Sequence, residues 1–135
     1  MMNIELSDKE FRRLLDLVYV GNWVLNSARG SDRFEDYDDL QEKMFALCAQ
    51  NGMKDLYTTW YGHTFPSRAY EEGGIHEAIA DYEDAVFFDI LAEELARDMH
   101  LEDTDPEDMT ELNHRMDEYI SEFEANGIDN LTIDI

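Results

Sequence analysis

The sequence is poor in positive charge. It contains ten Lys and Arg against thirty-three Asp and Glu, which gives a formal net charge of -23 at pH 7. Proteins that bind the phosphate backbone of nucleic acids use clustered Lys and Arg, and binding to an anionic lipid surface needs the same residues. We therefore expect neither direct nucleic-acid binding nor membrane binding.

The chain also lacks a second cysteine and a long apolar run. Cys48 is the single cysteine, so no disulfide can close within the chain, as is usual in a reducing compartment. No apolar run approaches the roughly 20 residues that cross a bilayer, and the N-terminal segment lacks the basic and then apolar pattern of a secretory signal. We expect a cytoplasmic protein in which Cys48 is a small buried side chain on a helix.

Enough apolar residues are present to build a hydrophobic core. Of the 135 residues, 44% are hydrophobic and 12% are aromatic, which excludes a wholly disordered acidic chain. The length suits one domain, and no repeat, low-complexity stretch or linker divides it. We expect a single helical domain over residues 1–135.

The clearest local signal is a helix start near the N-terminus. Ser7 and Glu10 have the spacing of a capping box. Leu6 and Phe11 occupy the two positions of a hydrophobic staple around that cap. We expect the first helix to begin here and to run to about Arg29.

Apolar periodicity predicts four further helices. The apolar positions recur at i, i+3, i+4 and i+7, the spacing that places them on one side of a helix. The last of these helices follows a Thr-Asp-Pro start signal. The expected helices cover residues 34–50, 53–61, 75–99 and about 104–126.

These patterns predict an all-α fold, a compact bundle of about five helices. The two ends of the chain, residues 3–6 and 131–135, alternate apolar and polar side chains and could pair as a minor two-stranded β element. Residues 85–96 are apolar nearly all round. A helix of that kind is central in its domain or shared between subunits, so we also consider a homodimer through Val86–Leu95.

The negative charge is concentrated in the second half of the chain. Residues 71–124 contain twenty acids and two bases. These bases, Arg97 and Arg115, each follow a glutamate by four residues, the favourable spacing for a helical ion pair. The net charge available to a partner therefore lies on the last two predicted helices.

We expect a non-enzymatic protein that binds a basic protein partner through this acidic surface, with a nucleic-acid mimic or inhibitor as a narrower version. Electrostatic steering would speed such an encounter. A solvated face that only keeps the protein soluble, or adaptation to high salt, would also explain the charge. The candidate partner-binding residues are Glu107, Asp108, Glu111, Glu118 and Glu122.

The alternative is a small helical-bundle enzyme or metal-binding protein that uses His and Glu around residues 71–77 and 111–114. Loops carry function disproportionately, and an acid–base pair such as Glu72 with His76 has the chemistry for proton transfer. The sequence contains no phosphate-binding loop, nucleophile elbow or zinc-binding helix motif, so we expect no cofactor. The residues of this alternative polar site are Tyr61, His63, Arg68, Glu71, Glu72 and His76.

Overall fold

The computed structural model describes residues 1–103 and 109–134, without the side chains of residues 99–103. It divides the chain into two compact units, unit 1 (Met1–Ile79) and unit 2 (Ala80–Ile135), which are described separately. The expectation of a single domain stays a prediction.

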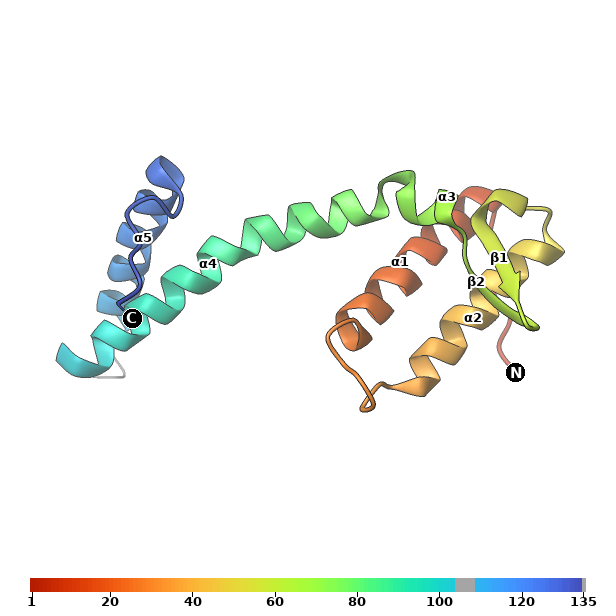
Figure 1. Ribbon diagram of the computed structural model, residues 1–135, viewed down its shortest axis with the longest axis horizontal. Helices are drawn as coiled ribbons and strands as arrows, with labels where there is room; N and C mark the ends of the chain where they lie inside the picture. Colours follow the sequence, from red (N-terminus) through yellow and green to blue (C-terminus); the bar gives the residue numbers. More distant parts are fainter. Residues whose placement is uncertain (104–108, 135) are drawn as a thin grey trace. The chain divides into compact units, whose positions relative to one another are not determined.

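Unit 1 begins with helix α1 (Asp8–Asn26), drawn in red to orange in Figure 1. The predicted capping box is confirmed, because the Ser7 hydroxyl accepts from the backbone N–H of Glu10 and the Glu10 carboxylate accepts from the backbone N–H of Ser7. Two N–H groups that no helical carbonyl can reach are thereby satisfied. Helix α1 ends three residues earlier than expected, at Asn26.

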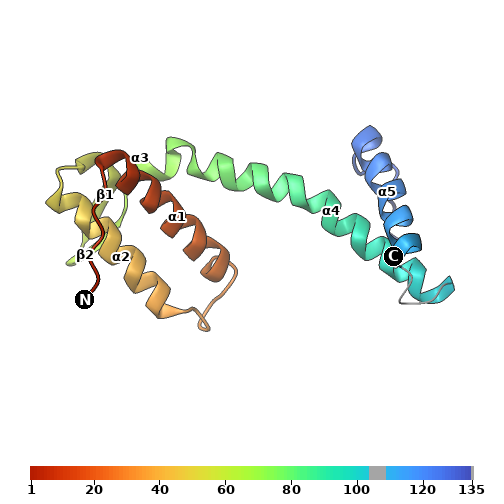
Figure 2. The same ribbon diagram turned by 180° about the vertical axis from the view of Figure 1, so that it is seen from behind.

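Helix α2 (Glu35–Gln50) lies beside α1 in both views of the fold (Figures 1 and 2). The core of unit 1 forms between these two helices, and Cys48 is fully buried in it, as predicted. Burial raises the pKa of the Cys48 thiol, which makes the thiol less reactive. The core side chains are Phe11, Leu15, Tyr19, Phe45, Cys48, Tyr70 and Ile79.

The predicted helix over residues 53–61 is wrong. A short 3-10 turn, η1 (Lys54–Leu56), leads instead into an antiparallel hairpin of β1 (Tyr57–Trp60) and β2 (His63–Pro66). The apolar spacing that suggested a helix is compatible with both structures, but β-branched and aromatic side chains favour a strand. The hairpin packs along α2 in unit 1 (Figure 1).

The hairpin turn explains why this segment is not helical. Tyr61 and Gly62 both have positive φ, 49° and 79°. Two consecutive residues of this kind form the tight turn whose twist matches that of paired strands. Glycine adopts this conformation without steric cost, so the Tyr-Gly pair sets the turn and with it the register of the hairpin.

A short connection then leads from the hairpin into α4. It consists of α3 (Arg68–Tyr70), capped by the Ser67 hydroxyl, and one wide turn, η2 (Glu71–Ile75). The Tyr70 ring is buried, and its hydroxyl donates to Oδ1 of Asp16 at 2.9 Å. The pKa of Tyr70 is raised, mainly by burial and to a lesser extent by the Asp16 carboxylate. The connection is therefore fixed to α1 by a neutral phenol.

Unit 2 consists of most of α4 (His76–Asp103) together with α5 (Met109–Asn126). Phe88 of α4 packs against Phe123 of α5 with ring centroids 5.3 Å apart, and Ala92 and Ala96 are buried on the same side of α4. The predicted start signal of the last helix, Thr104 to Pro106, lies outside the described residues.

As far as the structure describes them, the two ends of the chain do not pair as the β element that we expected, and the hairpin of β1 and β2 provides the minor β element instead. In the described ranges the hairpin is the single sheet, and residues 3–6 and 131–134 form no strand. Each end offers only two or three apolar side chains, too little to offset the ordering of an isolated two-stranded ribbon. The backbone N–H of Leu131 instead donates to the carbonyl of Ile128 in a turn.

The fold class is confirmed as all-α with a minor β element, with four long helices in the described residues instead of about five. Every described helix is too short or too polar to cross a membrane.

Candidate functional site

An open cavity of about 650 Å³ lies in unit 1, where α1, α2 and β2 meet. Cavities of this size commonly hold small ligands. Its lining side chains are Tyr19, Asn22, Trp23, Ser27, Arg33, Asp38, Asp39, Gln41, Glu42, Thr64, Phe65, Pro66 and Glu71.

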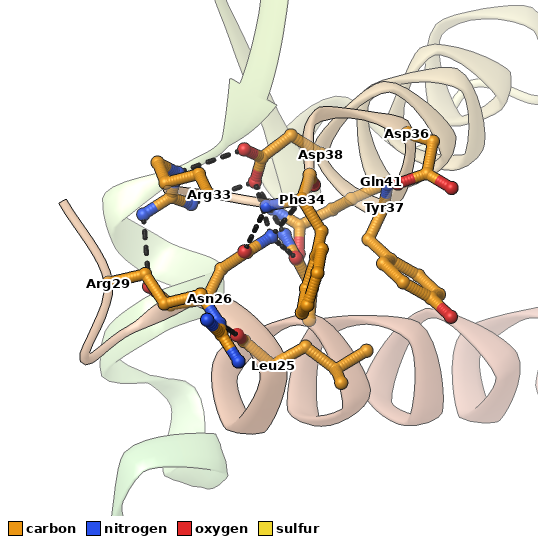
Figure 3. Close-up of polar contacts among 10 residues, drawn as sticks. Leu25, Asn26, Arg29, Arg33, Phe34, Asp36, Tyr37, Asp38 and Gln41 are labelled. Atoms are coloured by element: carbon orange, nitrogen blue, oxygen red, sulfur yellow. Dashed lines mark hydrogen bonds and ion pairs between the residues drawn. The ribbon is translucent and has the colours of Figure 1, made fainter. Parts of the chain in front are cut away.

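Two buried asparagines, Asn22 and Asn26, hold the end of α1 against the start of α2. The Asn26 amide accepts from the backbone N–H of Phe34 at 2.8 Å and donates to its carbonyl at 3.1 Å (Figure 3). The Asn26 amide also donates to Oδ1 of Asn22 at 2.7 Å. A buried polar group is costly to leave unpaired, so these bonds fix the loop between the two helices.

Arg33 and Asp38 form a two-pronged ion pair at one wall of the cavity. Nε and one terminal nitrogen of Arg33 donate to the two Asp38 oxygens at 2.9 and 2.8 Å (Figure 3). Asn22 donates to the same carboxylate at 3.0 Å. Arg33, followed by Asn22, lowers the pKa of Asp38, which keeps this carboxylate ionised and fully engaged at neutral pH.

An aromatic group forms another part of the wall. The Tyr19 and Trp23 rings stack with centroids 6.3 Å apart, and the His76 ring packs edge-on against Trp23 at 4.8 Å. The Tyr19 hydroxyl is 2.6 Å from Nε2 of His76. Burial, followed by the negative charge of Glu71, raises the pKa of Tyr19. The Trp23 ring is thus held in place by two neighbours.

Glu42 connects α2 to the hairpin at the edge of the cavity. Its Oε1 accepts from the backbone N–H of Thr64 at 2.9 Å and lies 3.0 Å from Nδ1 of His63. The bond from Thr64 and the contact with His63 lower the pKa of Glu42. This carboxylate therefore positions β2 against α2.

The residues of the alternative polar site do not gather at one place. Tyr61 is exposed in the hairpin turn, and His63 contacts Glu42. Arg68 donates to Glu72 at 2.7 Å on the surface. Tyr61 and His63 belong to the hairpin, whereas Arg68 and Glu72 belong to the connection that follows it.

Two members of that predicted site do lie together. Glu71 lines the cavity with Tyr19, and His76 contacts the Tyr19 hydroxyl. No hydrogen bond joins Glu72 to His76 in the part of the chain that the structure describes. In the same residues, including 71–77 and 111–114, no group of three or more His, Cys, Asp or Glu is placed to hold a metal ion.

Two of the predicted partner-binding acids on α5, Glu111 and Glu118, have local partners. Arg115 donates to Glu111 at 3.0 Å, and Nε2 of His114 lies 3.0 Å from Glu118. A surface hollow of about 660 Å³ lies beside these side chains. It is lined by Glu111, His114, Arg115, Glu118, Tyr119 and Glu122.

Of the remaining predicted partner-binding residues, the structure describes Glu122 but not Glu107 and Asp108. Glu122 accepts from Asn130 at 2.6 Å and from Asn126 at 2.9 Å, and these two bonds lower its pKa. Glu107 and Asp108 lie outside the described residues. The binding of a partner by these acids stays a prediction.

A different surface of unit 2 is apolar and exposed. Tyr82, Val86 and Ile90 follow one another at four-residue spacing on α4, on the side opposite the buried Ala92. The relative exposure is 64% for Tyr82, 51% for Phe87 and 56% for Ile90. We call Tyr82, Val86, Phe87 and Ile90 the α4 apolar stripe.

Acidic side chains border the α4 apolar stripe. At about 100° per residue, Asp89 lies at one edge of the stripe, Glu93 and Glu94 follow its C-terminal end, and Glu83 lies between Tyr82 and Phe87. Glu93 is paired with Arg97 at 2.6 Å, and the others are exposed. The bordering acids are Glu83, Asp89, Glu93 and Glu94.

Sequence reasoning missed the cavity, although one signal pointed to the polar junction beside it. Asn22 and Asn26 follow the helical spacing of Phe11, Leu15 and Tyr19, so two amides occupy core positions of α1. Buried amides need partners, which indicates a polar junction. No protein-family model, curated protein or solved structure matches this chain.

Proposed function

We propose that the protein binds a basic protein partner through the acidic surface of unit 2. The observation that carries the proposal is the α4 apolar stripe with its acidic border. Large exposed apolar patches commonly mark interaction sites. An apolar centre with a charged rim is also the usual anatomy of a protein interface.

The two parts of this surface would act at different stages of binding. Tyr82 and Phe87 offer aromatic anchors of the kind that contribute most of the affinity of an interface. The bordering acids would attract a basic partner and speed the encounter. The acids of α5 would add to the same field, although Glu111 and Glu118 are each held by a cationic or polar neighbour.

The partner we propose carries an amphipathic helix with apolar side chains on one side and Lys or Arg beside them. A helix of that kind can match both the stripe and its border. The narrower version, a nucleic-acid mimic, needs carboxylates in rows spaced like a duplex backbone. We also propose a cytoplasmic location, which the single buried cysteine supports.

A defined probe tests this proposal. Two synthetic helical peptides share the same leucines and differ in flanking lysines or glutamates, and binding to the full chain is followed by fluorescence anisotropy. We expect the lysine peptide to bind and the glutamate peptide not to bind. Replacing Phe87 and Ile90 together by Ala should weaken binding by about tenfold or more.

The control replaces two apolar residues of unit 1 that are even more exposed, Leu17→Ala with Val24→Ala, whose relative exposures are 71% and 69%. We expect this pair to leave the affinity unchanged. Equal loss in both double variants, or equal binding of both peptides, would refute the proposed site.

The second candidate is a homodimer through Val86–Leu95, which the same exposed side chains favour. Like charges on the two copies oppose it, because acids border the stripe on each. Sedimentation velocity over a wide concentration range separates the candidates. A dimer that dissociates on Phe87→Ala would replace the basic partner with a second copy, whereas a monomer at every concentration excludes the homodimer.

A further inference from the structure

We infer that the cavity of unit 1 binds a small organic cation, an ammonium group on an aliphatic body. Its lining contains one arginine and four carboxylates, so its charge is strongly negative. It also contains aromatic side chains, which attract cations through their ring faces. The inference does not depend on the function proposed for unit 2.

The single cationic group in the lining is already neutralised. Arg33 is held by both oxygens of Asp38. Asp38 also accepts from Asn22, which leaves it little capacity for another partner. An anionic ligand would therefore meet no available positive side chain in the cavity.

Two carboxylates in the lining remain available to a ligand. Glu42 is engaged by the backbone N–H of Thr64 and by His63. Asp39 and Glu71 line the cavity, and among the residues that the structure describes their carboxylates form no hydrogen bond or ion pair. Both are exposed, so they can meet an ammonium group without first losing a protein partner.

The aromatic part of the site is held in place before a ligand arrives. Trp23 is fixed by the Tyr19 ring at 6.3 Å and by the edge of His76 at 4.8 Å. Tryptophan is the most favourable aromatic partner for a cation, and a ring that is already ordered loses little entropy on binding. Phe65 adds a second exposed ring from β2.

The ammonium group could belong to a free amine or to a lysine side chain of a protein. Three probes distinguish these sources: choline, 1,5-diaminopentane and a blocked tripeptide with a central lysine. The fourth probe, 3,3-dimethylbutan-1-ol, has the shape of choline without its charge. Binding of each to the full chain is measured by isothermal titration calorimetry and by tryptophan fluorescence.

The chain provides matched controls for both kinds of contact. Asp39→Asn removes a lining carboxylate, and Asp36→Asn removes a nearby exposed one outside the cavity. Trp60 is the other tryptophan and does not line the cavity. In a Trp60→Phe background Trp23 is therefore the sole tryptophan, and Trp23→Leu removes the proposed contact, whose loss is then measured by calorimetry.

We expect at least one cationic probe to bind about tenfold more tightly than the neutral alcohol. Asp39→Asn and Trp23→Leu should each weaken that binding several-fold, whereas Asp36→Asn and Trp60→Phe should not. Tighter binding of the tripeptide than of the free amines would assign the site to a lysine side chain, and the reverse order would assign it to a free amine. Circular dichroism checks that each variant is folded.

Three results would overturn the inference. The first is the absence of saturable binding of every cation up to about 10 mM. The second is that no cationic probe binds more tightly than the neutral alcohol. The third is the same loss of affinity in Asp36→Asn as in Asp39→Asn, which would mean that cations follow the overall negative charge of the protein and not this cavity.

Discussion

The phenolic oxygen of Tyr19 lies 2.6 Å from Nε2 of His76, which joins the middle of α1 to the first residue of α4 within unit 1. The Trp23 ring packs against both side chains. The start of α4 and one wall of the cavity are thus stabilised by the same contacts.

This contact predicts a modest stabilising role for the Tyr19 hydroxyl. Tyr19→Phe keeps the ring and removes the hydrogen bond, which should cost about 0.5–1.5 kcal/mol of unfolding free energy. Urea denaturation followed by tryptophan fluorescence measures this, because both tryptophans lie in unit 1. Tyr37→Phe, at an exposed tyrosine, should change the free energy by less than about 0.5 kcal/mol. Equal effects would mean that the contact with His76 adds no stability.

Asn26 should be more sensitive to replacement than an exposed asparagine. Asn26→Ala leaves the backbone N–H and carbonyl of Phe34 without their side-chain partner, and the expected loss is about 1–3 kcal/mol. Asn51 has one side-chain bond in solvent, to the carbonyl of Leu47. Asn51→Ala should therefore cost less than about 0.5 kcal/mol in the same urea experiment. If Asn26→Ala lowered the unfolding free energy no more than Asn51→Ala does, the stabilising role of the polar junction would be refuted.

The hairpin turn predicts a difference between two glycines. Gly62 has φ of 79° and Gly30 lies outside the left-handed region, while open space surrounds both positions. Gly62→Ala should cost about 1–2 kcal/mol, because a Cβ disfavours the left-handed conformation, and Gly30→Ala should cost less. The urea midpoints of the two variants compare them directly. If Gly62→Ala were neutral, the turn would have another conformation.

Acidification should destabilise unit 1 through Asp38. Arg33 and Asn22 hold the folded-state pKa of Asp38 below its usual 3.8, so protonation favours the unfolded chain. The contribution of ionised Asp38 to the unfolding free energy is therefore complete above about pH 4, and it is lost as the pH falls through the folded-state pKa. An NMR titration of the Asp38 carboxyl should show a lowered pKa that rises toward 3.8 in Arg33→Gln. An unchanged pKa in that variant would show that the ion pair is absent in solution.

The sequence predicted the long helices because their signals are local. Ser7 and Glu10 satisfy each other across one helical turn, and the apolar spacing of residues 34–50 needs no distant partner to be recognised. The hairpin was misread because Met53, Leu56 and Tyr57 match a helical stripe as well as a strand. The positive φ of Tyr61 decided between the two structures, and tyrosine seldom adopts it.

The cavity could not be predicted from local patterns. It needs Trp23 from α1, Asp39 from α2 and Phe65 from β2, which come together only through the packing of unit 1. For the α4 apolar stripe, the sequence predicted the apolar character but not which side chains are exposed. Residues 85–96 were recognised as apolar all round, but α5 covers one side of the helix and leaves Tyr82 and Ile90 exposed.

The association rate of the lysine peptide with unit 2 tests the central claim most directly. It is measured by stopped-flow fluorescence at low and high salt, for the wild type and for a variant with Glu83, Asp89 and Glu94 replaced by Gln. We predict that salt slows association with the wild type, that the variant associates more slowly and with a weaker salt dependence, and that dissociation changes little. A variant with the association rate and salt dependence of the wild type would contradict the role of the acidic border in binding a basic partner.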